Sequence, residues 1–124
     1  MEYKDFIRAV AERAALSHQE AEDLARATVE MLGDRLSEGE ARRLATSLPE
    51  PLRGSLHVRD RAEDFGLHDF VTRVSERTGL TMKEATAGVR AVLVTVRETV
   101  DDEVFDHVLA QLPGEFQEMV ETTT

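Results

Sequence analysis

The chain has 124 residues, of which 41% are hydrophobic and 32% charged, and its net charge is −10. This length suits one domain, and these proportions are typical of a folded globular protein rather than of a disordered tail. The acidic charge disfavours nucleic acids and anionic membranes as partners, and the absence of cysteine excludes disulfides and thiolate chemistry.

The charge is unevenly distributed along the sequence. Residues 1–62 hold ten basic and twelve acidic side chains, a net charge of −2, whereas residues 63–124 hold five and thirteen, a net charge of −8. No apolar stretch has the length of a membrane span, and the initial MEYKDF lacks the layout of a signal peptide. We therefore expect a cytoplasmic protein.

The first predicted helix covers residues 3–14, because its apolar residues recur at helical spacing. A second helix follows from Ser17 to about Arg35, and its opening SHQE fits a capping box, in which Ser17 and Glu20 satisfy each other's backbone amides. The apolar residues of the first helix are Tyr3, Phe6, Ile7, Val10 and Ala14.

A third helix is predicted after SEGE, Ser37 to Glu40, which again spells a capping box. The dipeptide Leu48-Pro49 should end it and start a short fourth helix through Leu52 to Leu56. Residues 57–66 are charged and lie between glycines, so they are predicted to be a connector.

The second half of the chain predicts the same order of helices, at about 68–78, 81–98, after Asp101 or Asp102, and 116–120. The helix at 81–98 opens with TMKE, Thr81 to Glu84, which also fits a capping box. Its most apolar segment, AVLVTV at Ala91 to Val96, fits a buried strand as well as a buried helix. The matching segment upstream, ATVEML at Ala27 to Leu32, has helical spacing. We therefore predict that both segments are helices, and that the one at 81–98 is the central helix of the fold.

Residues 3–56 align without a gap with residues 67–120, at a constant offset of 64. We predict an all-α fold in which residues 1–124 form one globular helical bundle of two tandem homologous units. Each unit should have three to four helices, and the units should be related by a pseudo-twofold axis. Gly88 stands where the first unit has Leu24, which suggests a close approach of two helices. The identical pairs are Asp5/Asp69, Phe6/Phe70, Val10/Val74, Glu12/Glu76, Arg13/Arg77, Leu16/Leu80, Glu20/Glu84, Ala21/Ala85, Arg26/Arg90, Ala27/Ala91, Leu48/Leu112 and Pro49/Pro113.

Six of the charged residues that are retained in both units form the candidate site. We favour a structural role, in which salt bridges join Arg26 to Glu12 and Arg90 to Glu76. The alternative is a paired anion or partner site across the pseudo-twofold axis. The six residues are Glu12, Arg13, Arg26, Glu76, Arg77 and Arg90.

Signals for metal binding or catalysis are weak. His18 with Glu22, and Glu103 with His107, have the spacing of two ligands on one helix face, but nothing nominates further ligands. The carboxylates of Asp101, Asp102 and Asp106 would act as general acid and base if a cleft raised the pKa of one of them, but they lie at a predicted helix start, where carboxylates have a structural role. We predict no catalytic, cofactor-binding or metal-binding residues and no cofactor.

The motifs DFIRAVAERAALSHQEAEDLARA and DFVTRVSERTGLTMKEATAGVRA, each followed by a helix containing Leu-Pro, resemble the small bacterial family DUF2267. The resemblance covers essentially the whole chain. It implies an all-α fold and a bacterial cytoplasm. It implies no activity and therefore no functional residues, because the family has no established function.

We expect a helical module that binds a protein partner or itself, since small helical repeats present grooves that suit amphipathic segments. An exposed apolar patch would support this function. The alternative is an enzyme or a metal-binding protein with an unrecognised acidic or histidine site, for which a pocket of converging titratable groups is expected. A third hypothesis is that the acidic second half mimics nucleic acid and binds a basic partner.

Overall fold

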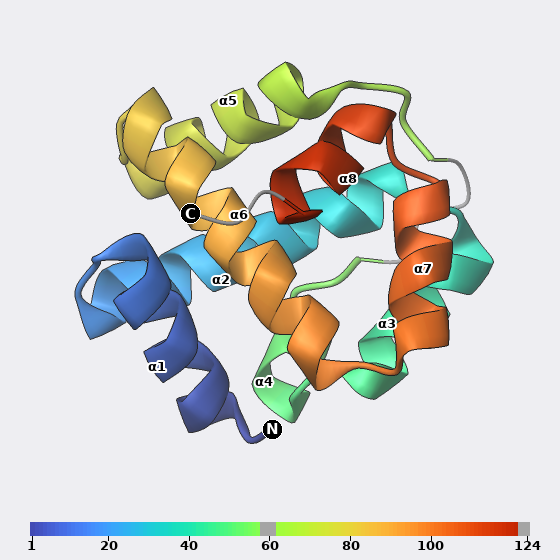
Figure 1. Ribbon diagram of the computed structural model, residues 1–124, viewed down its shortest axis with the longest axis horizontal. Helices are drawn as coiled ribbons and strands as arrows, with labels where there is room; N and C mark the ends of the chain where they lie inside the picture. Colours follow the sequence, from blue (N-terminus) through green and yellow to red (C-terminus); the bar gives the residue numbers. More distant parts are fainter. Residues whose placement is uncertain (58–61, 122–124) are drawn as a thin grey trace.

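The computed structural model describes residues 1–57 and 62–121. In these ranges the regular structure is entirely helical, which confirms the predicted all-α class (Figure 1). The helices are α1 (Tyr3–Ala14), α2 (His18–Arg35), α3 (Glu38–Ser47), α4 (Glu50–Arg53), α5 (Leu67–Thr78), α6 (Met82–Thr99), α7 (Asp102–Ala110) and α8 (Gly114–Glu121).

Helix α6 is the centre of the fold, and it packs against α1, α2, α5, α7 and α8. The segment Ala91 to Val96 is helical and buried except for Val94, which is half-buried. The prediction of a helix here is therefore confirmed. A helical segment whose only polar residue is Thr95 must be surrounded by other helices, because no broad side of it can face water.

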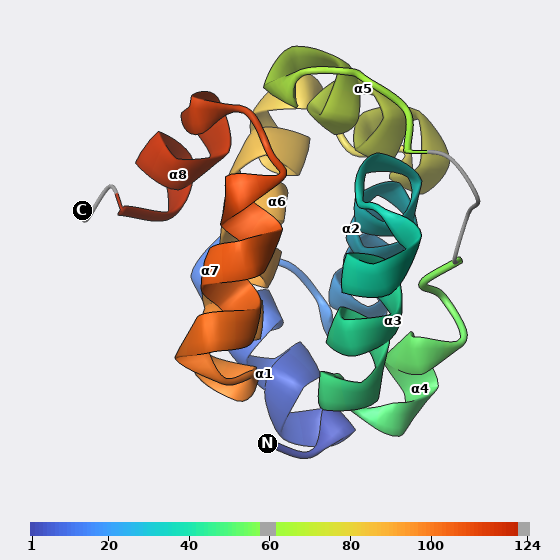
Figure 2. The ribbon, with the colours of Figure 1, turned by 90° about the vertical axis from the view of Figure 1, so that its right-hand side faces the viewer.

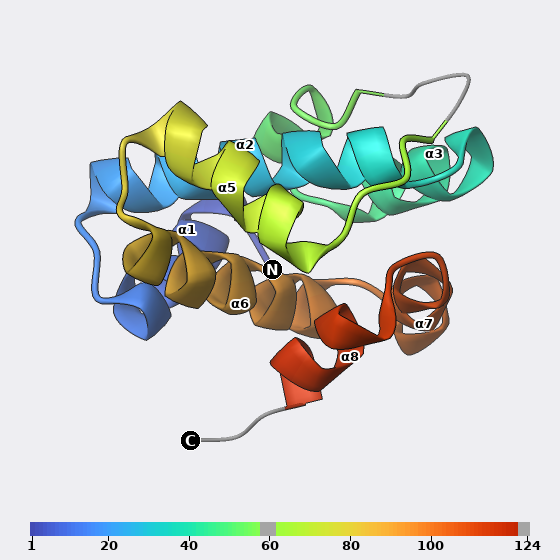
Figure 3. The same cartoon turned by 90° about the horizontal axis from the view of Figure 1, so that it is seen from above.

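Helices α2 and α6, each of 18 residues, run along the molecule beside each other (Figure 3). The amphipathic helix α1 packs on both of them, and so does α5. Helices α3 and α7 also contact each other, and Figure 2 shows them side by side. Thus α1 and α5 each bury their apolar face against both long helices.

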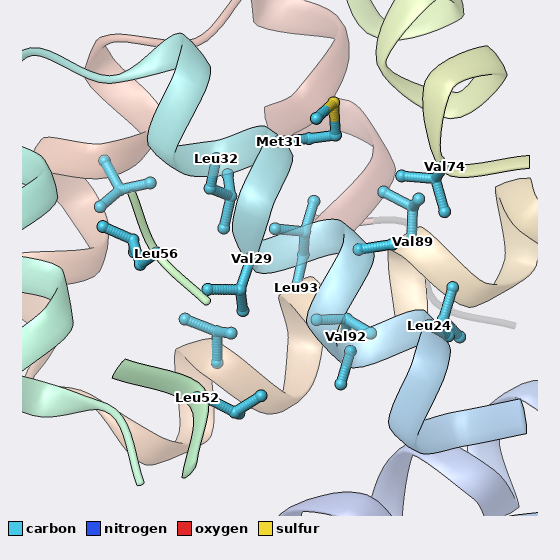
Figure 4. Packing of buried hydrophobic residues seen from close by; sticks show 14 of the residues in the cluster. Leu24, Val29, Met31, Leu32, Leu52, Leu56, Val74, Val89, Val92 and Leu93 are labelled. Carbon is cyan, nitrogen blue, oxygen red and sulfur yellow. The ribbon is translucent and has the colours of Figure 1, made fainter. Parts of the chain in front are cut away.

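The core forms where the side chains of α2 and α6 meet (Figure 4). Leu24 and Leu32 of α2 and Val92 and Leu93 of α6 are completely buried. Burial of such a side chain contributes about 1.5–3 kcal/mol, so this contact supplies much of the stability of the fold.

Gly88 lets α6 approach α2 closely, as its position opposite Leu24 in the repeat suggested. A Cβ atom at residue 88 would lie 2.6 Å from Cδ2 of Leu24 itself. The missing side chain at Gly88 therefore leaves the space that Leu24 fills.

Two of the three predicted capping boxes are confirmed, at Ser17 with Glu20 and at Thr81 with Glu84. At α3 only half of the box forms. The hydroxyl of Ser37 accepts from the amide of Glu40, but the amide of Ser37 donates to Oε1 of Gln111, at 2.8 Å. The prediction of a complete box at α3 was wrong because a side chain of the distant α7 segment takes the place of Glu40.

Helix α4 is shorter than predicted and ends at Arg53 rather than near Leu56. Arg53 turns back and donates from Nε to the carbonyl of Leu48, at 2.9 Å, and Leu56 is buried in the turn that follows. The connector then runs against the end of α2, where the amide of Glu63 donates to the carbonyl of Asp34, at 2.8 Å. Residues 58–61 of the predicted connector lie outside the described residues.

Candidate functional site

A pocket of about 350 Å³ opens between α1 and α6. Arg13 of α1 and Arg90 of α6 contribute charge, and Ala87, Ala91 and Val94 of α6 contribute a small apolar floor. We call these five residues the arginine pocket. Its volume lies near the lower end of the range of small-ligand pockets, about 300–1,000 Å³.

Arg13 is held in place by α6. Its Nη1 donates to the hydroxyl of Thr95, at 2.8 Å, and its Nη2 lies 2.7 and 2.8 Å from the two carboxylate oxygens of Glu98. Thr95 is fully buried, and its hydroxyl donates to the carbonyl of Ala91. These contacts fix the guanidinium group at the edge of the pocket.

Arg90 is half-buried and holds the end of α8. Its Nε donates to the carbonyl of Met119, at 3.0 Å. Further along α6, Nη1 of Arg97 donates to the carbonyl of Val120, at 3.1 Å. The last carbonyls of a helix have no partner within that helix and carry partial negative charge, which favours such arginine contacts. Both pocket arginines are therefore oriented by neighbouring helices.

The other retained arginines face acidic residues of α2. Nη1 of Arg77, on α5, lies 2.9 Å from Oε2 of Glu30, and Arg26 lies 3.9 Å from Asp23 within its own helix. Figure 3 shows α5 lying along α2, as this contact requires.

Neither predicted salt bridge, Arg26 to Glu12 or Arg90 to Glu76, occurs among the ion pairs of residues 1–57 and 62–121. Glu12 and Glu76 are exposed, whereas the arginines turn to groups on α2 and α8. The structure thus brings Arg13 and Arg90 together in one pocket and leaves both glutamates out of it. The sequence did not single out Thr95 or Glu98, because neither is retained in the first unit.

Polar contacts also surround two histidines. Nε2 of His18 lies 3.1 Å from Glu22, which accepts from the hydroxyl of Tyr3 at 2.8 Å. Burial raises the pKa of Tyr3 above its ordinary value, and the Glu22 carboxylate raises it further. Nδ1 of His107 accepts a hydrogen bond from Nη1 of Arg43, at 2.8 Å. Within the described ranges no three histidine, aspartate or glutamate side chains are grouped so as to hold a metal ion.

None of the described helices is both long enough and apolar enough to cross a bilayer.

The fold and pocket define a class of protein: an all-α domain in which two long helices are covered by shorter ones and an arginine-lined hollow opens beside the central helix. A family model described as "Uncharacterized conserved protein (DUF2267)" matches residues 3–119. The chain belongs to the DUF2267 family, as its paired motifs indicated. No curated protein matches the sequence.

Proposed function

We propose that the protein is an interaction module that binds a protein partner through the arginine pocket. The observation that carries this proposal is the pocket itself, which places two oriented guanidinium groups beside a small apolar floor. Its lining residues are basic or apolar, and the carboxylate of Glu98 pairs with Arg13 at the pocket edge. Polar groups that are oriented in this way provide specificity for a partner group.

We also propose that the chain consists of two homologous units, 3–56 and 67–120, related by a pseudo-twofold axis within one domain. Residues on such an axis contact their own counterparts. Two pairs separated by the repeat offset of 64 do so: Leu24 approaches Gly88, and Arg43 lies 2.8 Å from His107. The packing of α1 and α5 on both long helices is consistent with the same symmetry.

The exposed hydrophobic residues indicate which kind of contact a protein partner would make. In the part of the chain that the structure describes, the exposed large hydrophobic residues are Met1 and Met82, at 54% and 39% exposure. This does not provide the broad apolar patch expected for docking of an amphipathic helix. The proposal therefore depends on polar recognition in the pocket.

The enzyme and metal-binding alternatives gain no specific support. The pocket lining has no histidine or carboxylate that would transfer a proton, and the described residues hold no group of three metal ligands. We retain the cytoplasm as the proposed location, without nucleic acid or membrane as a partner, on the composition and charge of the sequence. A bacterial source is proposed on the resemblance to the family alone.

Filling the pocket tests the proposed function. Ala87 is exposed at the pocket, so Ala87→Tyr should fill the space without disturbing the core. Wild-type protein, this variant and the matched control Gln19→Tyr, on the exposed start of α2, are immobilised and exposed to extract of the native cell.

We expect at least one protein to be retained by wild type and by Gln19→Tyr but reduced tenfold or more with Ala87→Tyr. Equal retention by both variants, or equal loss, would contradict the pocket as the binding site. Circular dichroism establishes that both variants are folded.

A further inference from the structure

We infer that the arginine pocket takes an aromatic side chain of the partner protein, which lies on the apolar floor against the flat face of the Arg13 guanidinium group. This inference rests on the proposed function, and it names the kind of side chain that the pocket recognises. It follows from the bonds that Arg13 already makes and from a second arginine of the same chain.

The charge of Arg13 is already balanced within the chain. Its Nη2 lies 2.7 and 2.8 Å from the two carboxylate oxygens of Glu98, and its Nη1 donates to the hydroxyl of Thr95. Arg90 donates from Nε to the carbonyl of Met119. An anionic ligand would have to compete with these groups, so an anion is a poor ligand for the pocket.

The planar guanidinium group of an arginine has a second way to bind. Its hydrogen-bond donors lie in its plane, whereas its two faces stack on aromatic rings. The positive charge attracts the electron-rich face of a ring, and this attraction does not require the donors that Thr95 and Glu98 engage. Arg13 can therefore keep both of its partners while a ring lies against it.

Arg73 has such an arrangement elsewhere in the chain. Its Nη1 lies 3.2 Å from Oε2 of Glu63, and its Cζ lies 4.0 Å from the centre of the buried Phe65 ring. The side chains of Arg73 and Arg13 are equally exposed, at 36%. Arg73 thus binds a glutamate with its edge and a phenylalanine with its face. Arg13 has the corresponding glutamate, Glu98, and lines a pocket instead of covering a ring.

The floor of the pocket favours a ring over a polar side chain. Ala87, Ala91 and Val94 offer apolar contact and no hydrogen bond from their side chains. An aromatic side chain buries about 150–250 Å² on binding, and its face is attracted to a cation as well. An aliphatic side chain would make the apolar contact without that attraction.

A second copy of this chain does not offer the ring. Tyr3 packs against the core and donates its hydroxyl to Glu22, and the chain has no tryptophan. The ring therefore belongs to a different protein. The five phenylalanines are all buried: Phe6, Phe65, Phe70, Phe105 and Phe116.

The test uses the full chain, labelled with nitrogen-15, and four probes: acetyl-Ala-Phe-Ala-amide, the same peptide with cyclohexylalanine, the same peptide with glutamate, and toluene. We expect the phenylalanine peptide to shift the amide signals of Ala87, Ala91 and Val94 saturably. Cyclohexylalanine has a similar size but no π system, so its peptide should bind about threefold more weakly or worse. The glutamate peptide, which competes with Glu98, and toluene, which lacks the flanking amides, should each bind more weakly still.

The variant Arg13→Lys keeps a positive charge beside Glu98 but removes the flat face. An ammonium group that binds Glu98 does not also cover a ring, so the phenylalanine peptide should lose its advantage over the cyclohexylalanine peptide. The control Arg8→Lys, at an exposed position of the same helix, should retain that advantage. Denaturation midpoints show whether each variant is folded.

Equal binding of the phenylalanine and cyclohexylalanine peptides to wild type would overturn the contact with the Arg13 face, and tighter binding of the glutamate peptide would overturn the aromatic ring. Toluene binding as tightly as the phenylalanine peptide would overturn the partner side chain in favour of a free aromatic compound. Absence of any binding would overturn the inference as a whole. The retention experiment with Ala87→Tyr decides the proposed function separately, so the two failures are distinguishable.

Discussion

Two buried threonines of the long helices differ in whether their hydroxyl group makes hydrogen bonds. Thr28 and Thr95 are both fully buried, but the hydroxyl of Thr28 has no hydrogen-bond partner among the described residues. The hydroxyl of Thr95 donates to Ala91 and accepts from Arg13. A buried hydroxyl without a partner destabilises the fold, because it loses its bonds to water and gains none.

We expect Thr28→Val to raise the free energy of unfolding by about 1 kcal/mol, since it removes an unsatisfied hydroxyl and keeps the shape. The counterpart of Thr28 in the repeat is already Val92. The matched control Thr95→Val should lower the free energy by about 1 kcal/mol because it breaks two hydrogen bonds. Urea denaturation measures both, and a loss of stability in Thr28→Val would contradict the argument.

Gly33 allows the connector to lie on α2. A Cβ atom at this position would be 2.6 Å from the carbonyl oxygen of His57, which is backbone and cannot rotate away. We expect Gly33→Ala to destabilise the protein by about 1–3 kcal/mol, even though alanine favours a helix by about 1 kcal/mol. Gly39→Ala in α3, with no neighbour within 4 Å, should instead be neutral or stabilising. Thermal unfolding distinguishes the two, and similar shifts for both would contradict the close contact.

The charged residues of the site were identifiable from the sequence, but their partners were not. Arg13 and Arg90 stood out because both are retained in the repeat. Which acid or carbonyl each arginine meets depends on which helix lies opposite, and Thr95 is 82 residues from Arg13. Sequence spacing within one unit therefore led to Glu12 and Glu76, which are exposed.

At the scale of the helices, local signals were the more reliable guides. The boxes at Ser17 and Thr81 form within four residues, so the sequence contains all their determinants. The cap of α3 depends on Gln111, which is 74 residues from Ser37, and no local pattern indicates it. At the end of α4, Arg53 turns back to the carbonyl of Leu48, and the Leu-Pro pattern does not indicate this contact either.

The capping box of α2 should contribute a pH-dependent stability. The amide and hydroxyl of Ser17 lower the pKa of Glu20 below its ordinary value, so the folded state favours the ionised carboxylate. This contribution is complete above the unfolded pKa, about 4.3, and is lost as the pH falls through it towards the folded pKa.

We therefore expect Glu20→Gln to flatten the fall of stability between about pH 5 and pH 3. Near neutral pH the change should be small, because glutamine also completes a capping box. Denaturation midpoints across this range provide the measurement. Glu76→Gln, at an exposed position of α5, serves as the control and should leave the slope unchanged; an equal change in both variants would contradict the capping origin.

For the whole molecule, the repeat predicted the helices and their order but not the pocket. The helices follow from the pattern that the aligned segments 3–56 and 67–120 have in common, whereas the pocket is lined at positions where they differ, at Ala87 and Val94 against Asp23 and Glu30. It also requires α1 to lie on α6, which is a contact between distant parts of the chain. The alignment of residues 3–56 with 67–120 shows these differences. Only the packing of the helices shows that Ala87 and Val94 line a pocket.

The shared core predicts that the whole chain unfolds in one transition. Phe116 of α8 is fully buried and packs edge-on against Phe70, with ring centroids 5.2 Å apart. We expect Phe116→Ala to lower the free energy of unfolding by about 3–5 kcal/mol. Tyr3 is the single tyrosine and tryptophan is absent, so its fluorescence reports on α1.

Tyr3 fluorescence and circular dichroism should therefore shift to the same lower midpoint in Phe116→Ala. Ala110→Gly, an exposed change at the end of α7, should lower the free energy of unfolding by no more than about 1 kcal/mol, whether it is measured by fluorescence or by circular dichroism. A Tyr3 transition that stays in place while the helical signal moves would show that the two parts of the chain unfold independently.

The contact of α1 with α6 also has a consequence for synthesis on the ribosome. Arg13 and Thr95 are 82 residues apart, so at about 5–20 residues per second the first helix waits roughly 4–16 seconds for its partner. During that interval Phe6, Ile7 and Val10 belong to a nascent polypeptide that has not yet produced one of the two helices that bury them. The central helix α6 is therefore synthesised late in translation, and the packing of α1 is completed only after α6 emerges.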